Sequence, residues 1–430
     1  MGFKSGRVTY CRFKVMGDGP SSVDEAALSI LNEHRFREVE IGAPDEVEVG
    51  FVTGDHILDT QFSYEKNGFG NLLMFAIRID THKVPSEMKQ AYKMMNEQAA
   101  ASGNPSGFAS KADKRDAKEL AERQIHEDLA SGKYRKSKMV PVLWDLKAGY
   151  MYLGGASNAI IEELCRVMRH AFAVDLEYVS GGTYAGHSLR EKHSGRDFDD
   201  FRPTKYTKPP AAAALIHDED DASGDAAYGG SQGGGEPIVP WVAKSTDLKD
   251  FLGNEWLMWL WFVCEKFDGL ISAKVDGVDE EIFVAITKSL QMECAWDAGG
   301  KVSLSGDGVR VYKEAGEALV QGKWARKFGM ILSSGEDTFE LNLQGDKYVI
   351  GSALLPEIME AETPREIVEA RLLKIMVLSQ LLDAVYDVFL EQRSNTGKWA
   401  NIKNEMSKWI KERRLEKVAV AMKEEVVAAG

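Results

Sequence analysis

The sequence predicts an α+β fold built from mixed sheets and long helices. The chain has 430 residues, of which 44% are hydrophobic, so it can bury a core and form two or three domains. Runs with the alternation or the apolar character of strands occur in both halves of the chain. Longer segments with helical spacing and helix-start signals lie between them. This mixture of strands and helices favours the α+β class.

The first half contains three strand-like and three helix-like segments before a hairpin. In order, we expect strands at 6–16, 47–52 and 71–80, and helices at 22–34, 85–101 and 110–131. Ser22 and Glu25 have the spacing of a capping box at the first helix. Pro85 suits the first turn of the second helix. The third helix is densely charged.

A basic stretch then leads into the predicted hairpin. One strand ends at Trp144–Asp145, a tight turn covers 147–149, and a second strand covers Tyr150–Leu153, followed by a helix at 157–172. The stretch holds four cations, one aromatic ring and no acid: Lys133, Tyr134, Arg135, Lys136 and Lys138. Such residues can neutralise phosphates, and the ring can stack on a base or insert at the backbone. A solvated loop is the competing interpretation.

The middle of the chain changes character. Repeated glycines, an alanine run at 211–214 and an acidic run at Asp218–Asp221 cannot offset the entropy of ordering the chain. We therefore expect four parts. They are an N-terminal α+β half at 1–180, a flexible Gly/Ala/Asp-rich insertion at 181–245, a C-terminal α+β half at 246–393 and a basic helical tail at 394–430.

The second half begins with a tryptophan-rich helix around 251–264, interpreted as core or as an oligomer interface. Strands are expected at 270–275, 281–288, 290–296, 323–333 and 337–343, with a short helix at 309–322. Thr363, Pro364 and Glu366 form a strong helix start. The helix that follows repeats apolar residues at steps of four and three, as a coiled coil does. This seam is either intramolecular core or a dimer interface, and it includes Leu372, Ile375, Leu382, Tyr386 and Phe389.

A second basic group occurs at 322–327. If this segment is a strand, Lys323 and Lys327 share a face and Arg326 points to the other. Lysines that protect an exposed strand edge from aggregation are the competing explanation.

Composition excludes several classes of protein. A net charge of −14 argues against a surface that is basic throughout, but a local basic groove can still attract DNA. The four cysteines are far apart, so we expect neither a zinc site nor a disulfide framework. The longest apolar run, at 256–264, is too short for a membrane helix. We expect a cytoplasmic protein with no membrane partner, no metal and no cofactor.

Catalytic patterns are weak. The glycine pairs at 154–155 and 181–182 lack the Gly-Lys-Ser/Thr of a phosphate-binding loop. His187 and His193 lie in a Gly-rich segment that does not suggest a metal site, and no nucleophile has a recognisable setting. We expect no catalytic residues and a protein that is not an enzyme.

The order of these motifs resembles the RdgC family of recombination-associated proteins. The stretch from Val84–Pro85 through Phe172 is similar to the family's N-terminal half, and Val49–Val52 resembles its Gly–aromatic–Val segment. Glu314–Leu343, with Gly322–Lys323 and Lys327, resembles the C-terminal half, and Thr363–Leu390 resembles the closing amphipathic helix. The chain departs from the family at 180–250 and after about 393. Asp307–Gly308 stands where the family carries a Lys–Gln pair, with Arg310 the nearby cation.

The resemblance implies a ring-shaped homodimer that encircles duplex DNA without sequence preference and limits the access of RecA. RecA filaments would then be affected indirectly, and the protein would be associated with the nucleoid. The DNA contacts expected from the residues and the resemblance are Lys133, Tyr134, Arg135, Lys136, Lys138, Arg310, Lys323, Arg326 and Lys327. The seam residues would close the dimer. The alternatives are a metal-dependent nuclease and a protein-interaction scaffold that does not bind DNA.

Overall fold

The structure, a computed structural model, describes residues 2–37, 47–105, 107–192, 195–209, 249–296, 300–358 and 361–428, without the side chains of 195–197 and 414–428. The chain forms two compact units. The N-terminal unit is Lys14–Glu177, and the C-terminal unit combines Met1–Phe13 with Tyr178–Gly430. Antiparallel sheet and helices occur in both units, which confirms the predicted α+β class.

The N-terminal unit is built on an antiparallel sheet with the strand order β6-β5-β4-β2, and β3 also pairs with β4. Its strands are β2 (Val47–Val52), β3 (Gly68–Phe69), β4 (Leu72–His82), β5 (Arg135–Asp145) and β6 (Tyr150–Leu153). Its shorter helices are α1 (Glu25–Glu33), α2 (Tyr64–Asn67) and α5 (Asn158–Phe172). The predicted hairpin is therefore confirmed as β5 and β6.

Helix α5 covers one face of this sheet. The helix buries Leu164 and Met168, and Phe172 at its end packs against Phe51 of β2 and Trp144 of β5. The start of α1 differs from the prediction. Asp24, and not Ser22, caps the helix by accepting a hydrogen bond from the Ala27 N–H at 2.9 Å. A carboxylate at the N-cap also suits the positive end of the helix dipole.

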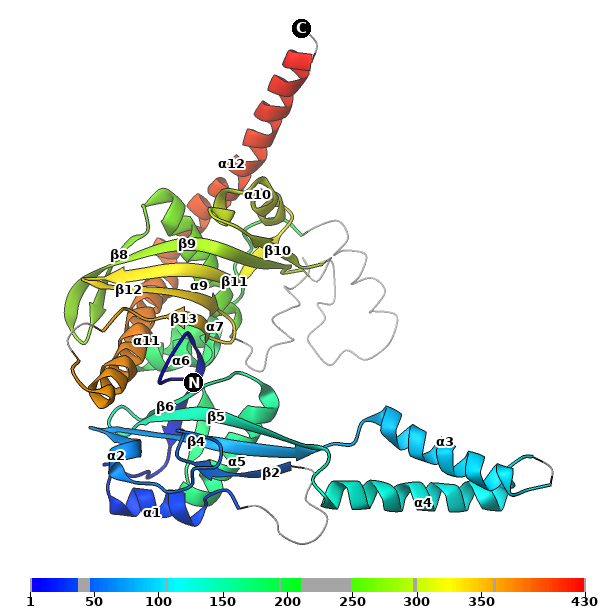
Figure 1. The fold of residues 1–430 in the computed structure, drawn as a ribbon. Helices are drawn as coiled ribbons and strands as arrows, with labels where there is room; N and C mark the ends of the chain where they lie inside the picture. The colour runs from blue at the N-terminus through cyan, green and yellow to red at the C-terminus, as the bar shows by residue number, and fades with distance from the viewer. Residues whose placement is uncertain are drawn as a thin grey trace. The chain divides into compact units, whose positions relative to one another are not determined.

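Two long helices project from the sheet as an arm, which Figure 1 shows extending beyond the ends of β4 and β5. They are α3 (Ser86–Ser102) and α4 (Lys111–Ala130), the two helices predicted for this region. A capping box between Ser110 and Asp113 starts α4. Among the described residues of the two helices, only Ala117 and Ala121 are buried. The arm therefore has almost no core of its own.

The C-terminal unit contains a larger antiparallel sheet in the order β10-β9-β11-β12-β13-β1, with β8 pairing with β9. Its strands are β1 (Val8–Met16), β8 (Leu270–Val275), β9 (Val278–Cys294), β10 (Val302–Ser305), β11 (Lys323–Ser334), β12 (Asp337–Gln344) and β13 (Val349–Leu354). A further strand, β7 (Asp175–Tyr178), pairs with β1. The two strands predicted at 281–296 are one strand with an irregularity at Lys288, whose φ is 58°.

The first residues of the chain belong to the C-terminal unit because β1 pairs with β13, placing Val8 opposite Ala353 and Tyr10 opposite Ile350. The sequence-based division at residue 180 did not include this long-range pairing. The C-terminal unit is thus assembled from both ends of the described chain.

The helices of the C-terminal unit are α6 (Gly181–Glu191), α7 (Gly195–Asp200), α9 (Phe251–Lys266), α10 (Lys313–Val320), α11 (Pro364–Ser394) and α12 (Thr396–Ala428), with the short 3₁₀ turn η3 (Val309–Val311). Every residue of α9 from Phe251 to Cys264 is buried, so the core interpretation of the tryptophan-rich helix is confirmed. Thr363 and Glu366 form the predicted capping box of α11. The segment predicted as a basic tail is helical, and Trp399, Met406 and Trp409 are buried, so α12 begins as part of the core.

The expectation of a flexible insertion is wrong for residues 181–192 and 198–209. Ser180 caps α6 through a capping box with Thr183, and Phe201 and Tyr206 are buried. The glycines have a packing role, because a Cβ on Gly181 would lie 2.8 Å from the Gly345 carbonyl oxygen. The rest of the expected insertion, with Asp218–Asp221, lies outside the described residues, as does His193.

Candidate nucleic-acid interface

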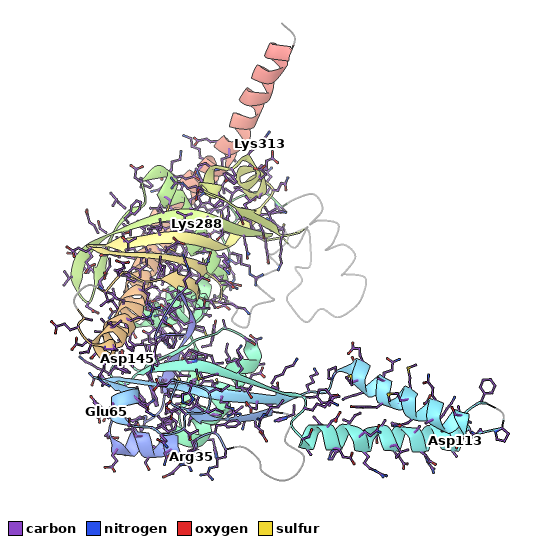
Figure 2. The ribbon with its side chains drawn as sticks, viewed as in Figure 1. Arg35, Glu65, Asp113, Asp145, Lys288 and Lys313 are labelled. Carbon is purple, nitrogen blue, oxygen red and sulfur yellow. The ribbon has the colours of Figure 1, made fainter. Side chains whose placement is uncertain are left out.

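The predicted basic stretch lies where the arm meets the sheet. Lys133 and Tyr134 are in the turn after α4, while Arg135, Lys136 and Lys138 are within β5 and not in a loop. In Figure 2, the labelled Asp145 marks the end of β5 farthest from the arm, and Asp113 lies near the tip of the arm. The five predicted residues belong to one short segment of the chain, but the structure gives their side chains different surroundings.

Lys133 and Tyr134 are both engaged by Asp128, near the end of α4. The Asp128 carboxylate accepts hydrogen bonds from Lys133 Nζ at 2.8 Å, from Tyr92 Oη at 2.5 Å and from Tyr134 Oη at 3.3 Å. The bonds from Lys133 and Tyr92 lower the pKa of Asp128, and the bond to Asp128 raises the pKa of Lys133. These two predicted DNA contacts therefore also connect α3 and α4 to the turn before β5.

Arg135 points to the face of the sheet that carries a buried ion pair. Arg78 binds the fully buried Asp80 through Nε at 3.0 Å and through its terminal nitrogen at 2.7 Å. Arg135 Nε lies 3.9 Å from the same carboxylate. Arg135 thus helps to compensate a buried charge, which costs free energy when it is left unpaired.

Lys136 and Lys138 share the opposite face of the sheet. They lie opposite Thr81 and Ile79 of β4, and both side chains are exposed. Their Cα atoms are separated by about 7 Å, as for any residues i and i+2 of a strand. No ion pair joins either ammonium group to another residue within the described parts of the chain. They are therefore the members of the predicted stretch best placed to meet an external anion.

The start of α5 lies on the same face, next to these lysines along β5. Val140, two residues beyond Lys138, lies beside Gly155 in the loop that leads into α5, 3.8 Å from where a Cβ on that glycine would be. Ser157, Asn158 and Ala159 at the helix start are exposed, and the N-cap Ser157 makes no side-chain cap bond. A helix start presents N–H groups and a partial positive charge to an anion. The sequence signal for this helix start is the Gly154–Gly155 pair, although it lacks the Gly-Lys-Ser/Thr of a phosphate-binding loop.

The second basic group is divided by a β-bulge. Lys323 and Ala325 of β11 lie opposite Cys294 and Met292 of β9, but Lys327 follows opposite Gln291, so Arg326 is an extra residue without a partner in the pairing. The prediction that Lys323 and Lys327 share a face is wrong, because one extra residue reverses the alternation of side chains. Lys327 therefore shares a face of the sheet with Gln291, whereas Lys323 lies on the opposite face with Met292.

Arg326 and Arg310 are held by groups inside the C-terminal unit. Arg326 binds Glu293 at 2.5 Å and Asp346 at 3.0 Å. Arg310 donates to the Cys264 carbonyl oxygen at 3.0 Å. Both side chains are only partly exposed. Their observed contacts account for their positions without a phosphate.

The five predicted dimer-interface side chains are core. Leu372, Ile375, Leu382, Tyr386 and Phe389 each have 0% of their surface exposed in the single chain. Other residues of the chain already cover them, so the prediction that they contact a second subunit is wrong and the core interpretation of the seam is confirmed. Tyr386, for example, stacks on Trp256 with ring centroids 4.4 Å apart.

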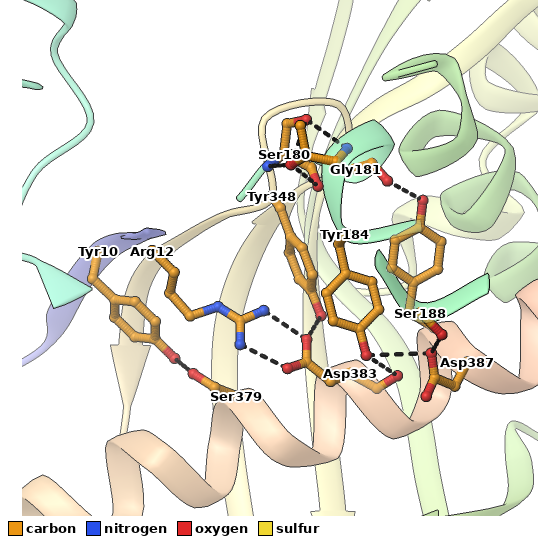
Figure 3. A network of polar contacts seen from close by, with 12 residues as sticks. Tyr10, Arg12, Ser180, Gly181, Tyr184, Ser188, Tyr348, Ser379, Asp383 and Asp387 are labelled. Atoms are coloured by element: carbon orange, nitrogen blue, oxygen red, sulfur yellow. Dashed lines mark hydrogen bonds and ion pairs between the residues drawn. The ribbon is translucent and has the colours of Figure 1, made fainter. Parts of the chain in front are cut away.

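A polar network on the same helix was not predicted from the sequence. Arg12 of β1 binds Asp383 of α11 with two hydrogen bonds of 2.7 and 2.6 Å, and Tyr348 donates to the same carboxylate at 2.6 Å, as Figure 3 shows. Ser188 of α6 donates to Asp387, one turn further along α11, at 2.6 Å. Burial raises the pKa of Tyr348 well above its usual value, so it remains a neutral donor. The network joins β1 and α6 to α11.

The described residues contain no group of three or more His, Cys, Asp or Glu side chains that could hold a metal ion. None of the described helices is both long and apolar enough to cross a membrane. No protein-family model and no curated protein matches this chain.

Proposed function

We propose that the protein binds DNA without sequence preference and modulates homologous recombination. The proposal includes the homodimer that encircles duplex DNA and limits RecA access, as the RdgC resemblance implies. The observation that carries the DNA-binding part is the surface formed by Lys136, Lys138 and the start of α5. Two ammonium groups and the positive end of a helix can contact neighbouring phosphates without reading base edges.

The decisive experiment reverses the charges of Lys136 and Lys138 only. Reversing the charge of Lys133 would also disturb its partner Asp128, and reversing that of Arg135 would disturb the buried Asp80. A loss of binding could then reflect misfolding. Glutamate at 136 and 138 still places charges beside the part of β5 that β6 does not cover, so it should not promote edge-to-edge aggregation.

The Lys136→Glu/Lys138→Glu variant should bind an unrelated duplex about 100-fold more weakly, since each charge-assisted contact contributes about 1.5 kcal/mol. The slope of log affinity against log salt should become shallower by about 2. The matched control is Lys408→Glu/Lys411→Glu on α12, which makes the same change of charge on exposed residues of the other unit. Equal affinities for the wild type and the 136/138 variant would reject this interface.

The recombination part has a separate readout. Wild-type protein bound to duplex should slow RecA-driven strand exchange, and the 136/138 variant should not slow it at the same concentration. Unchanged exchange in the presence of bound wild-type protein would remove the recombination role and leave DNA binding in place.

A protein-interaction scaffold is the second candidate, and the surface of the arm favours it. Met94, Met95, Leu120 and Phe108 are exposed on α3, on α4 and in the loop between them, and Phe108 is 79% exposed. Exposed apolar side chains that gather on one element often mark a site for a protein partner. This candidate predicts no affinity of the wild type for duplex DNA at moderate salt, so the binding assay above distinguishes the two functions.

A further inference from the structure

Strand β8 forms one edge of the sheet in the C-terminal unit. It pairs with β9 from Leu270–Phe283 to Val275–Val278, and within the described part of the chain no strand pairs with its other side. Figure 1 shows β8 and β9 together at the margin of this sheet. An unpaired edge of this kind can accept a further strand.

The hairpin turn determines which backbone groups face outward. Asp276 and Gly277 both have positive φ, 49° and 84°, as in the two-residue turns that close a hairpin with a hydrogen-bonded pair. Val275 and Val278 are that closing pair, and bonding alternates along the ladder. Val275, Ala273 and Ile271 therefore direct their N–H and C=O groups toward β9. Leu270, Ser272 and Lys274 direct theirs away from it, and their side chains are exposed.

Apolar surface gathers beside this edge. Leu270 and Phe283 face each other across β8 and β9 and are 58% and 38% exposed, and Phe267, just before β8, is 56% exposed. Lys274 is the only charged residue of β8, while the neighbouring segment of β9 carries Asp279, Glu280 and Glu281.

We infer that β8 pairs with β8 of a second copy of this chain, antiparallel and with the two-fold axis at Ser272. This inference rests on the homodimer in the proposed function, for which the buried seam on α11 offers no interface. Each Ser272 would exchange both of its backbone hydrogen bonds with the other Ser272. Each Lys274 N–H would donate to the Leu270 carbonyl of the other copy.

The two-fold pairing is complementary in both charge and apolar surface. Each Lys274 would lie in a row between its own Asp279 and Leu270 of the other copy. The aliphatic part of its side chain would cover the exposed Leu270–Phe283 pair, and its ammonium group would remain near the Asp279 carboxylate. An isologous contact of this kind closes after two copies, so it produces a dimer and not a filament.

The first test removes only the outward N–H. Ser272→Pro should leave the pairing with β9 intact, because proline is tolerated in an edge strand where its nitrogen faces outward. Light scattering should give twice the 47.6 kDa chain mass for the wild type and for the control Ser272→Ala, and the single-chain mass for Ser272→Pro. A monomeric wild type would overturn the inference and leave the edge for a peptide of another protein. A Ser272→Pro dimer would also overturn it.

The second test does not depend on how the proline variant folds. Opposed residues in a hydrogen-bonded pair have Cα atoms about 5.5 Å apart, within the range that a disulfide spans. In a Cys165→Ser background, Ser272→Cys should form a disulfide-linked dimer under mild oxidation. The control Lys274→Cys should not, because its two copies would be about 14 Å apart. No cross-link at 272, or equal cross-linking at both positions, would overturn the proposed pairing.

The two proposals fail separately. Cross-linking at 272 without any affinity for DNA would keep the edge pairing and reject the proposed function. Salt-dependent DNA binding by a monomer would keep the interface at Lys136 and Lys138 and reject the edge pairing.

Discussion

Glu255 is a carboxylate with no exposed surface, in the second turn of the tryptophan-rich helix α9. Arg393 of α11 donates to it at 2.8 Å, and the Thr204 N–H donates at 2.5 Å. The Arg393 guanidinium also lies over the rings of Phe201 and Trp399, 4.5 and 4.9 Å from their centroids. One buried ion pair thus joins α9, α11, α12 and the segment after α7.

Removing the arginine should destabilise the protein strongly. Arg393→Ala leaves Glu255 buried without its cation, a change that typically costs about 3–5 kcal/mol of unfolding free energy. Denaturant unfolding measures this cost. The control Arg115→Ala removes one partner of an exposed pair on α4, whose side chains are 76% and 65% exposed, and should change stability by less than about 0.5 kcal/mol. Similar costs for the two variants would contradict this account.

At the residue scale, the sequence indicated where cations gather but not which carboxylates they meet. Composition placed Lys133, Arg135 and Arg326 in basic groups. The structure pairs each of them with an acid from another element. The bulge at Arg326 depends on the pairing between β9 and β11 and has no signal in the alternation of β11 alone. Lys136 and Lys138 have no acid opposite them on β4, because the paired residues, Thr81 and Ile79, are uncharged.

At the scale of elements, glycine allows three segments of the C-terminal unit to approach closely. A Cβ on Gly253 of α9 would lie 2.0 Å from the Gly345 carbonyl oxygen, and a Cβ on Gly181 of α6 would lie 2.9 Å from Gly253 Cα. Backbone therefore contacts backbone where α6, α9 and the turn after β12 meet. This contact explains why the glycines at 181–182 belong to a packed helix and not to a linker.

Adding one methyl group at this contact should force the elements apart. Gly253→Ala should lower the thermal midpoint and destabilise the protein by about 1–3 kcal/mol or more, as overpacking does. Gly397→Ala is the matched control, because this glycine also lies in the first turn of a helix but meets only an ordinary contact of 3.6 Å. A Gly253→Ala variant as stable as Gly397→Ala would show that α9 can shift without cost.

The joint between the arm and the sheet should respond to acid. The pKa of Asp128 is lowered by its bonds from Lys133 and Tyr92, so its contribution is present above the unfolded value of about 3.9 and is lost as pH falls through the lower folded value. Amide exchange in α3 and α4 should therefore be slower in the wild type than in Asp128→Asn at about pH 6. The difference should shrink as the pH falls below about 3.9. A difference of the same size in acid would mean that the ionised Asp128 carboxylate does not stabilise the arm.

Local patterns predicted the long helices best. The capping box at Thr363 and the helix predicted at 157–172 depend on neighbours within a few residues, and both are confirmed. The seam of α11 shows where local reasoning ends. Its spacing predicts a buried face, but the partners of Leu372 and Tyr386 come from distant segments. Periodicity cannot distinguish a partner in the same chain from one in a second copy.

At the scale of the whole molecule, one unit is formed by a single segment of the chain and the other by two separate segments. The N-terminal unit is one continuous segment with its own sheet and helices. The C-terminal unit needs residues 2–13, since β1 pairs with β13 and Arg12 binds Asp383. These contacts join residues at least 340 positions apart, so no pattern within a window of sequence could predict them.

This topology predicts an asymmetry between truncated chains. A chain of residues 14–177 should fold cooperatively by itself, because the pairings among β2, β3, β4, β5 and β6 and the packing of α5 lie within it. Residues 178–430 alone should not fold stably. They would lose strand β1, which pairs with β13. Asp383 would also lose Arg12, and Ser379 would lose Tyr10.

Joining residues 1–13 to the start of 178–430 through a flexible linker should restore cooperative unfolding, because the strand is then again part of the same chain. Circular dichroism and denaturant titration measure the result. A linked chain carrying Arg12→Ala provides the control, since it restores β1 but not the ion pair with Asp383, and it should be less stable than the linked wild type. If residues 178–430 unfold cooperatively and with full stability without β1, the pairing with β13 does not hold this unit together.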